Sequence, residues 1–181
     1  MASESVVLTR LIPWIAPATE ADWNALYTEQ LPRVYNFFRY RVGDGPVAED
    51  LTSIIFEKAW RARHRYRRDL AAFSTWLFSI ARNVAVDHYR QQRPHVPIEE
   101  AGDLPGGDDP AAAAERRSDG EHLAQLLALL PERERELLSL KYGAGMTNRA
   151  IARATGLGES NVGTIVHRTV ALLRAGWNEG A

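Results

Sequence analysis

The apolar positions between residues 48 and 93 recur with the period of an α-helix, and they predict two helices separated by a polar segment. In the first helix, Leu51, Ile55 and Ala59 follow one another at spacings of four, and carboxylates occupy the first turn. In the second, one stripe holds Phe73, Trp76, Leu77, Ile80, Ala81, Val84, Ala85 and His88. A stripe of this width is typical of a helix that buries one face against a core.

The segment that joins these helices, residues 58–68, is basic and has aromatic rings among its charges. Its charged residues are all cations, namely Lys58, Arg61, Arg63, Arg65, Arg67 and Arg68, and its rings are Trp60, His64 and Tyr66. The polar face of the following helix carries the hydrogen-bonding residues Thr75, Ser79, Arg82, Asn83, Asp87 and Arg90. Bases of a single strand stack on rings while guanidinium groups hold phosphates. The pattern favours a nucleic-acid surface, although a solvated basic helix also explains the charges.

Helix signals around this region define a first domain over residues 20–93. A helix is predicted from Glu20, interrupted or restarted at Pro32 and ended by the turn-forming residues 43–46. Residues 1–19 are too short for a domain and predict an N-terminal tail. Residues 94–120 combine proline, glycine and acidic side chains, a composition that buries too little apolar surface to fold alone. They predict a flexible acidic linker.

The pattern over residues 121–177 predicts a second helical domain that contains a helix-turn-helix, although an ordinary helical bundle fits it too. Pro131 starts one helix, and Thr147 can cap the next, a short one. Gly156 supplies a tight turn before a longer helix, the element that enters a DNA major groove in such motifs. The outward face of that helix is predicted to hold Glu159, Ser160, Asn161, Gly163, Thr164, His167 and Arg168. The expected fold class is all-α, with two small helical domains joined by the linker.

The net charge of −1 over 181 residues conceals a separation of charge along the chain. Residues 24–93 carry twelve Lys or Arg against seven Asp or Glu, a net +5, whereas residues 94–121 carry two against eight, a net −6. A near-neutral total therefore does not exclude a nucleic-acid surface. The chain has no cysteine, no apolar run of membrane-spanning length and no signal-peptide pattern. We expect a cytoplasmic protein without membrane insertion.

Catalytic motifs give no support for an enzyme. The five histidines lack the HExxH pattern and any other metal-ligand spacing, and the chain has no glycine-rich phosphate loop. We therefore expect neither enzyme activity nor a metal or cofactor.

Both halves of the chain resemble a known family. Phe56 and residues 48–52, 59–62, 76–83 and 87–90 resemble the promoter-opening domain of extracytoplasmic-function (ECF) sigma factors, subunits of bacterial RNA polymerase. Residues 130–133, 151–152 and 167–168, with Gly156 and Val162, resemble the sigma-factor domain that binds the minus-thirty-five promoter element. The order and spacing of the two domains match the family across nearly the whole chain.

The resemblance implies an RNA polymerase sigma factor that recognises and melts the minus-ten element and contacts the minus-thirty-five element. Its implied partners are core RNA polymerase, promoter DNA and an anti-sigma factor. Polymerase contacts are implied for Asp50, Ile54 and Lys58. Contacts with the minus-ten element and the melted strand are implied for Arg61, Arg65, Tyr66, Arg67, Arg68, Thr75, Ser79, Arg82 and Asn83. Upstream contacts are implied for Ser160, Asn161, Thr164, His167 and Arg168.

Two places depart from the family pattern. Gly163 and Ile165 stand where many members have basic residues, which predicts fewer contacts to the upstream element. Ser53 and Ile54 stand where Gln-Glu is common, so we expect a more apolar or an altered polymerase contact.

Two other functions stay open at this point. A stand-alone helix-turn-helix regulator leaves the basic aromatic segment unexplained. A helical adaptor that docks an acidic protein explains the charge, and salt-sensitive binding to single-stranded DNA would argue against it.

Overall fold

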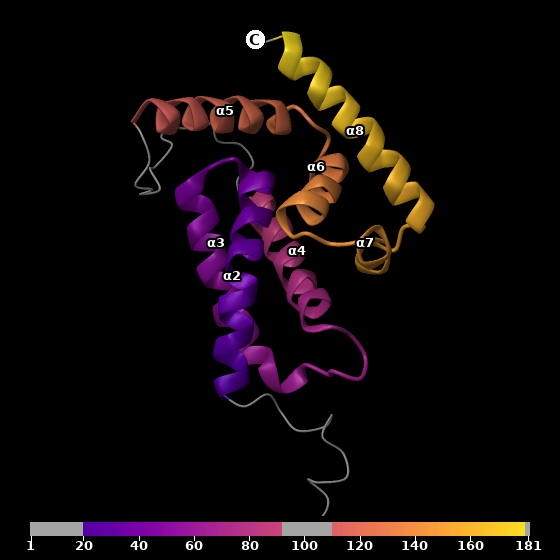
Figure 1. The fold of residues 1–181 in the computed structure, drawn as a ribbon. Helices are drawn as coiled ribbons and strands as arrows, with labels where there is room; N and C mark the ends of the chain where they lie inside the picture. Colours follow the sequence, from indigo (N-terminus) through magenta and orange to yellow (C-terminus); the bar gives the residue numbers. More distant parts are fainter. Residues whose placement is uncertain (1–19, 92–109, 180–181) are drawn as a thin grey trace, which may run out of the picture.

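The computed structural model describes residues 20–91 and 110–179, and it contains no strand within them. Its first three helices, α2 (Glu20–Val42), α3 (Gly45–Ala62) and α4 (Phe73–Gln91), lie side by side as a bundle (Figure 1). A short 3-10 turn, η1 (Arg63–Arg65), follows α3. The expected tail over residues 1–19 lies outside the described residues. None of the helices in the described part combines the length and the apolarity that a bilayer crossing requires.

Local sequence signals explain where α2 ends and α3 begins. Gly43 has a φ of 78°, a left-handed conformation that glycine adopts at no steric cost. The Asp44 carboxylate accepts a hydrogen bond from the Val47 backbone N–H at 2.8 Å, so it caps α3. Pro46 lies in the first turn, where its missing N–H removes no helical hydrogen bond. The predicted turn is confirmed.

The buried faces of the three helices share one core. Its larger side chains are Trp23, Val34, Phe37, Phe38, Leu51, Ile55, Phe56, Phe73, Leu77 and Phe78. The expected break at Pro32 is wrong, because α2 runs through the proline. Both halves of α2 bury apolar side chains in this core, and that burial offsets the hydrogen bond that the proline removes.

The second domain consists of α5 (Pro110–Ala128), α6 (Glu132–Leu138), the π-helical turn η2 (Ser139–Gly143), α7 (Asn148–Thr155) and α8 (Glu159–Glu179). Helices in both domains confirm the all-α class. The linker expected over 94–120 is corrected at its end, because residues 110–120 begin α5, while residues 94–109 lie outside the described part. Four alanines follow Pro110, and alanine has the highest helix propensity.

The predicted helix-turn-helix is confirmed in α7, the turn after it and α8. The Thr147 hydroxyl accepts a hydrogen bond from the Ala150 backbone N–H at 3.2 Å and caps α7. Gly156 ends α7 with a φ of 74°, again a left-handed conformation. Val162 and Val166 are buried on the inner side of α8. Local signals in the sequence therefore place this motif correctly.

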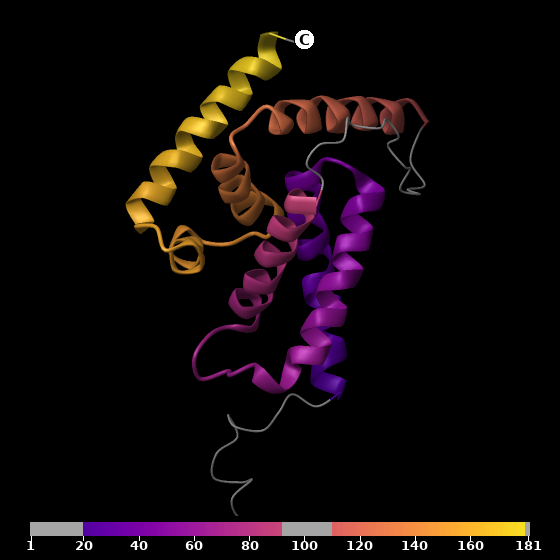
Figure 2. The same ribbon diagram turned by 180° about the vertical axis from the view of Figure 1, so that it is seen from behind.

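The two domains pack against each other. The turn η2 lies against α2 and α7 approaches α4, an arrangement seen from behind in Figure 2. A Cβ atom added at Gly143 would lie 2.8 Å from the Asn36 carbonyl oxygen and from the Phe37 Cα, so only glycine lets these backbones come so close. One apolar core therefore continues from the first domain into the second.

Candidate nucleic-acid interface

Residues 61–72, called the basic connector below, link the end of α3 to the start of α4 at one end of the bundle. Its exposed arginines are Arg61, Arg63, Arg65, Arg67 and Arg68. Arg61 forms an ion pair with Glu57 one turn earlier in α3, at 2.5 Å. An exposed cationic segment of this kind attracts the phosphates of nucleic acid.

Aromatic rings fix the basic connector to the bundle. Tyr66 is half-buried, and its ring centroid lies 5.3 Å from that of Phe73 and 5.2 Å from that of Trp76. Its hydroxyl donates to the Ala71 carbonyl oxygen at 3.3 Å. Burial raises the pKa of this phenol, and the charge of Arg68 acts in the opposite direction. Tyr66 anchors the connector, and its assignment to the melted strand stays a prediction.

Arg67 is held by a carboxylate within the connector. Its Nε and Nη2 atoms donate to the two carboxylate oxygens of Asp69, at 2.9 and 2.7 Å. This hydrogen bonding raises the pKa of Arg67 and lowers that of Asp69. Because the pair is exposed, a phosphate can replace the carboxylate as a two-oxygen acceptor.

A stacked pair in the same region was not foreseen from the sequence. The guanidinium carbon of Arg63 lies 3.9 Å from the centre of the Trp60 ring, within cation–π range. The Trp60 ring in turn meets the edge of Trp23, with centroids 5.3 Å apart. The spacing of three residues between Trp60 and Arg63 was the available signal, because such pairs are neighbours on a helix.

The polar face of α4 is only partly open. Its predicted contact residues are Thr75, Ser79, Arg82 and Asn83. The first is half-buried, and Ser79 and Asn83 are exposed. Arg82 differs, because its Nε donates to Glu136 Oε1 at 2.6 Å and its Nη1 donates to the Ala154 carbonyl oxygen. Both acceptors belong to the second domain, so the structure places Arg82 between the domains.

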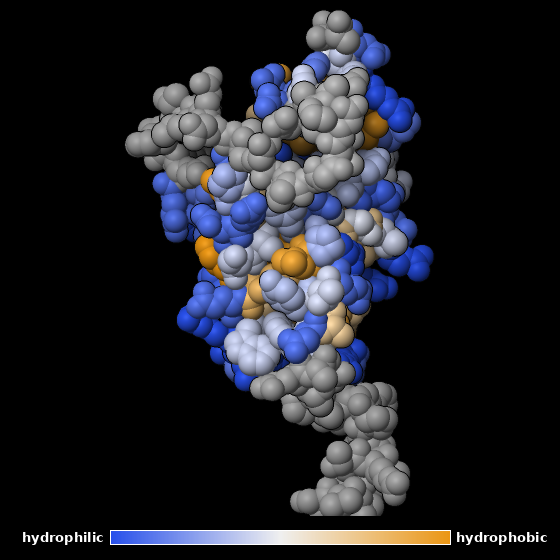
Figure 3. Space-filling view, turned by 60° about the vertical axis from the view of Figure 1, so that its left-hand side comes forward, coloured by the Kyte–Doolittle hydropathy of each residue, from blue (hydrophilic) through white to orange (hydrophobic). Residues whose placement is uncertain are grey.

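The residues predicted to face polymerase form one row on α3. Asp50, Ile54 and Lys58 follow at spacings of four, and all three are exposed, Ile54 by 37%. Figure 3 shows the side of the molecule that lies on the left of Figure 1, where hydrophobic residues are scattered among hydrophilic ones. The row suits a contact of mixed polarity, and its assignment to polymerase stays a prediction.

The predicted upstream contacts share the outer face of α8. They are Ser160, Asn161, Thr164, His167 and Arg168, all exposed. The expected outward position of Gly163 is wrong, because a Cβ atom there would point at the Asn148 side chain of α7, 3.2 Å away. Ile165 is half-buried and packs on the core. Their lack of charge therefore removes little from the outer face.

Two family models match this chain at its two domains. The Sigma-70 region 2 model matches residues 26–95, and the Sigma-70 region 4 model matches residues 121–173. The RNA polymerase sigma factor CarQ of Myxococcus xanthus is 32% identical over 82% of this chain and 85% of its own length. The ECF RNA polymerase sigma factor ShbA of Streptomyces griseus is 32% identical over 70% of each chain. The chain belongs to the ECF family of RNA polymerase sigma factors.

Other relatives of this sigma factor agree. The ECF RNA polymerase sigma factor BldN of Streptomyces coelicolor is 29% identical over 87% of this chain, and the match spans 61% of BldN. The sigma factor RpoE of Bartonella quintana, solved with the anti-sigma factor NepR, has a TM-score of 0.69 at 21% identity and covers 87% of this chain and 97% of its own. CnrH, solved with the cytosolic domain of CnrY, has a TM-score of 0.67 at 21% identity, over 95% and 97%. These structures share the fold.

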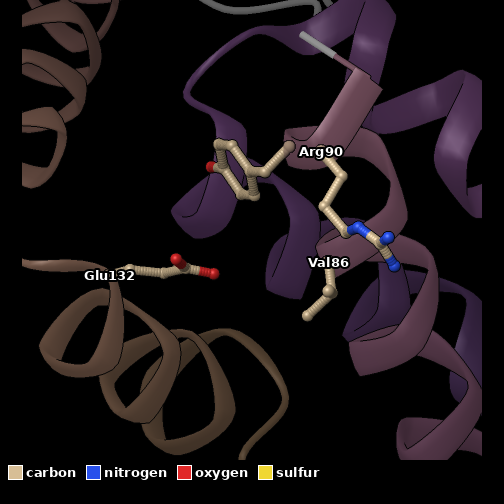
Figure 4. Close-up of a pocket in the computed structure, with 4 residues that line it drawn as sticks. Val86, Arg90 and Glu132 are labelled. Atoms are coloured by element: carbon tan, nitrogen blue, oxygen red, sulfur yellow. The ribbon is translucent and has the colours of Figure 1, made fainter. Parts of the chain in front are cut away.

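An open cleft of this sigma factor lies between α4 and α6. Its lining residues are Val86, Tyr89, Arg90 and Glu132. Figure 4 shows the Glu132 carboxylate pointing from α6 toward α4, which carries Val86 and Arg90. The Tyr89 hydroxyl donates to the Arg41 carbonyl oxygen, and burial raises the pKa of that phenol. The cleft has one wall from each domain, so its shape depends on how the domains pack.

Two arginines of α2 were missed as contact residues. Arg33 donates through Nε to the Ala144 carbonyl oxygen at 2.8 Å. Arg41, only 2% exposed, donates to the carbonyl and carboxylate oxygens of Glu132 at 3.0 and 3.1 Å. The signal was their spacing of four on either side of Phe37, which puts two cations on a buried stripe. The sequence does not tell which distant oxygens satisfy them.

Proposed function

We propose that this chain is a specificity subunit that brings core RNA polymerase to promoters and opens the duplex at the minus-ten element. The observation that carries the proposal is the exposed basic connector, which lies within the region 2 match of a chain that also has a region 4 match. A stand-alone regulator needs only the second match. A docking adaptor needs neither DNA-reading helix.

Each element receives one role in this proposal. The α3 row of Asp50, Ile54 and Lys58 binds polymerase. Arginines of the basic connector hold the backbone of the separated strand, the α4 face reads the minus-ten element and α8 enters the major groove at the minus-thirty-five element. The protein catalyses no covalent step, because tighter binding of melted than of duplex DNA is enough to shift the opening equilibrium.

An anti-sigma factor is proposed as a further partner. RpoE of Bartonella quintana was solved with one, NepR, and CnrH was solved with the cytosolic domain of CnrY. The likeness of fold supports a comparable partner for this chain. We also propose residues 20–93 and 121–177 as its two functional units, acting in the cytoplasm with the polymerase.

Run-off transcription with core polymerase and genomic templates tests this function. The chain should convert unspecific initiation into discrete transcripts. Ile54→Asp should remove these transcripts and weaken binding to core polymerase without changing the helical circular dichroism, because Ile54 is exposed. Leu129→Asp, at a position 82% exposed after α5, is the matched control and should transcribe normally.

Absence of discrete transcripts with the unchanged chain would contradict the sigma function itself. Discrete transcripts from Ile54→Asp at the normal level would instead show that polymerase binds another face.

A further inference from the structure

The contacts between the domains include one residue that the proposed function assigns to DNA. The Arg82 side chain is 24% exposed and that of its partner Glu136 is 17% exposed, so their ion pair is largely removed from solvent. Water and salt screen such a pair less than a surface pair. The Ala154 carbonyl oxygen accepts a second hydrogen bond from the same guanidinium. Two acceptors of the second domain therefore occupy Arg82.

The second domain fits α2 by shape as well as by charge. Gly143 is not among the positive-φ glycines of the described residues, which are Gly43, Gly145 and Gly156. Alanine at Gly143 is therefore compatible with the local turn, and the restriction comes from the α2 backbone 2.8 Å away from its Cβ position. Gly143 is needed for the packing of the domains and not for η2 itself.

The same interface contains polar groups that the packing leaves unpaired. The Nε atoms of Arg41 and Arg135 are buried and have no hydrogen-bond partner within the described residues. A buried N–H without a partner has lost its hydration and gained nothing in return. Separation of the domains returns both groups to water, which favours a reversible interface of the kind found between domains of one chain.

We propose that the packed arrangement is a closed state of the free protein, in which the second domain keeps Arg82 from DNA and must leave α4 before the minus-ten element binds. This rests on the proposed function, which assigns Arg82 to that element. Phosphates and base edges need the same N–H donors that Glu136 and Ala154 occupy, so the second domain and DNA compete for one guanidinium. The closed state lowers the apparent DNA affinity by the fraction of molecules that are open.

Distance measurements between two spin labels test the closed state. The chain has no cysteine, so Ser53→Cys on α3 and Arg174→Cys on α8, both at exposed positions, give one label in each domain. The free protein should show one short, narrow distance distribution. Gly143→Ala should lengthen and broaden it. Gly120→Ala is the matched control, because a Cβ atom there meets nothing within 4 Å, and it should leave the distribution unchanged.

Binding of a labelled, random-sequence single-stranded oligonucleotide tests the competition. If the free chain is open about a tenth of the time, full opening by Gly143→Ala raises the affinity about tenfold. Adding Arg82→Ala should remove this gain. Glu136→Ala, compared with Glu49→Ala at an exposed position of α3, provides a second route to opening should Gly143→Ala fail to fold by circular dichroism.

An unchanged distance distribution in the folded variants would overturn the closed state. A longer distance without tighter oligonucleotide binding, or a gain that survives Arg82→Ala, would overturn the shielding of Arg82. The label distances do not depend on transcription, so failure of the run-off assay with the unchanged chain would count against the sigma function alone.

Discussion

Tyr66 and its neighbouring arginines have different environments in the basic connector. The Tyr66 ring contacts Phe73 and Trp76, whereas Arg65 and Arg67 are exposed. Burial of an aromatic ring stabilises the fold, while exposed charges contribute little to it. Neighbouring residues therefore serve folding and DNA binding separately, and substitutions can distinguish the two roles.

Tyr66→Ala should lower the free energy of unfolding by about 2 kcal/mol, because it empties a half-buried aromatic position. Tyr66→Phe keeps the ring and loses only the hydrogen bond to Ala71, so it should cost less than about 1 kcal/mol. Urea unfolding followed by circular dichroism measures both. Equal stability of Tyr66→Ala and the unchanged protein would show that the ring is not packed in this cluster.

At the scale of elements, the helix-turn-helix could be predicted because its signals are local. The cap at Thr147 and the left-handed Gly156 act within a few residues of themselves. Gly143 could not be understood in this way, since the atoms that require a glycine there belong to α2. Gly163 was misplaced for a similar reason, because α7 rather than solvent lies against it.

Gly156→Ala should destabilise the protein by about 1 kcal/mol, because the left-handed φ of 74° is strained for an L side chain. Gly158→Ala is the matched control two residues later, at a position without a positive φ and without an atom within 4 Å of the added Cβ. It should change stability by less than about 0.5 kcal/mol. Thermal unfolding compares them, and equal losses would contradict the role given to the turn.

At the scale of the whole molecule, the sequence predicts the two domains and most of their exposed contact residues, but not how the domains pack. Hydrophobic periodicity identifies which face of a helix is buried, and it does not identify what covers that face. Arg33, Arg41 and Arg82 find their acceptors in the other domain. The start of α5 at Pro110 likewise reflects local helix propensity within an acidic segment that composition alone marks as a linker.

The central claim is that the basic connector stabilises the separated strand, and one comparison tests it most directly. Arg65→Ala combined with Arg67→Ala should reduce transcription from a duplex promoter by at least about tenfold, because phosphate contacts are lost. The same variant should be largely active on a template already mismatched at the start site. Arg133→Ala with Arg174→Ala, an equal charge change at exposed positions of the second domain, is the control.

The quantity to measure is therefore the ratio of duplex to pre-melted transcription for the connector variant against the control variant. The account predicts a large fall in this ratio for the connector variant alone. An equal loss on both templates would contradict it, because the connector arginines would then serve docking or folding instead of strand opening.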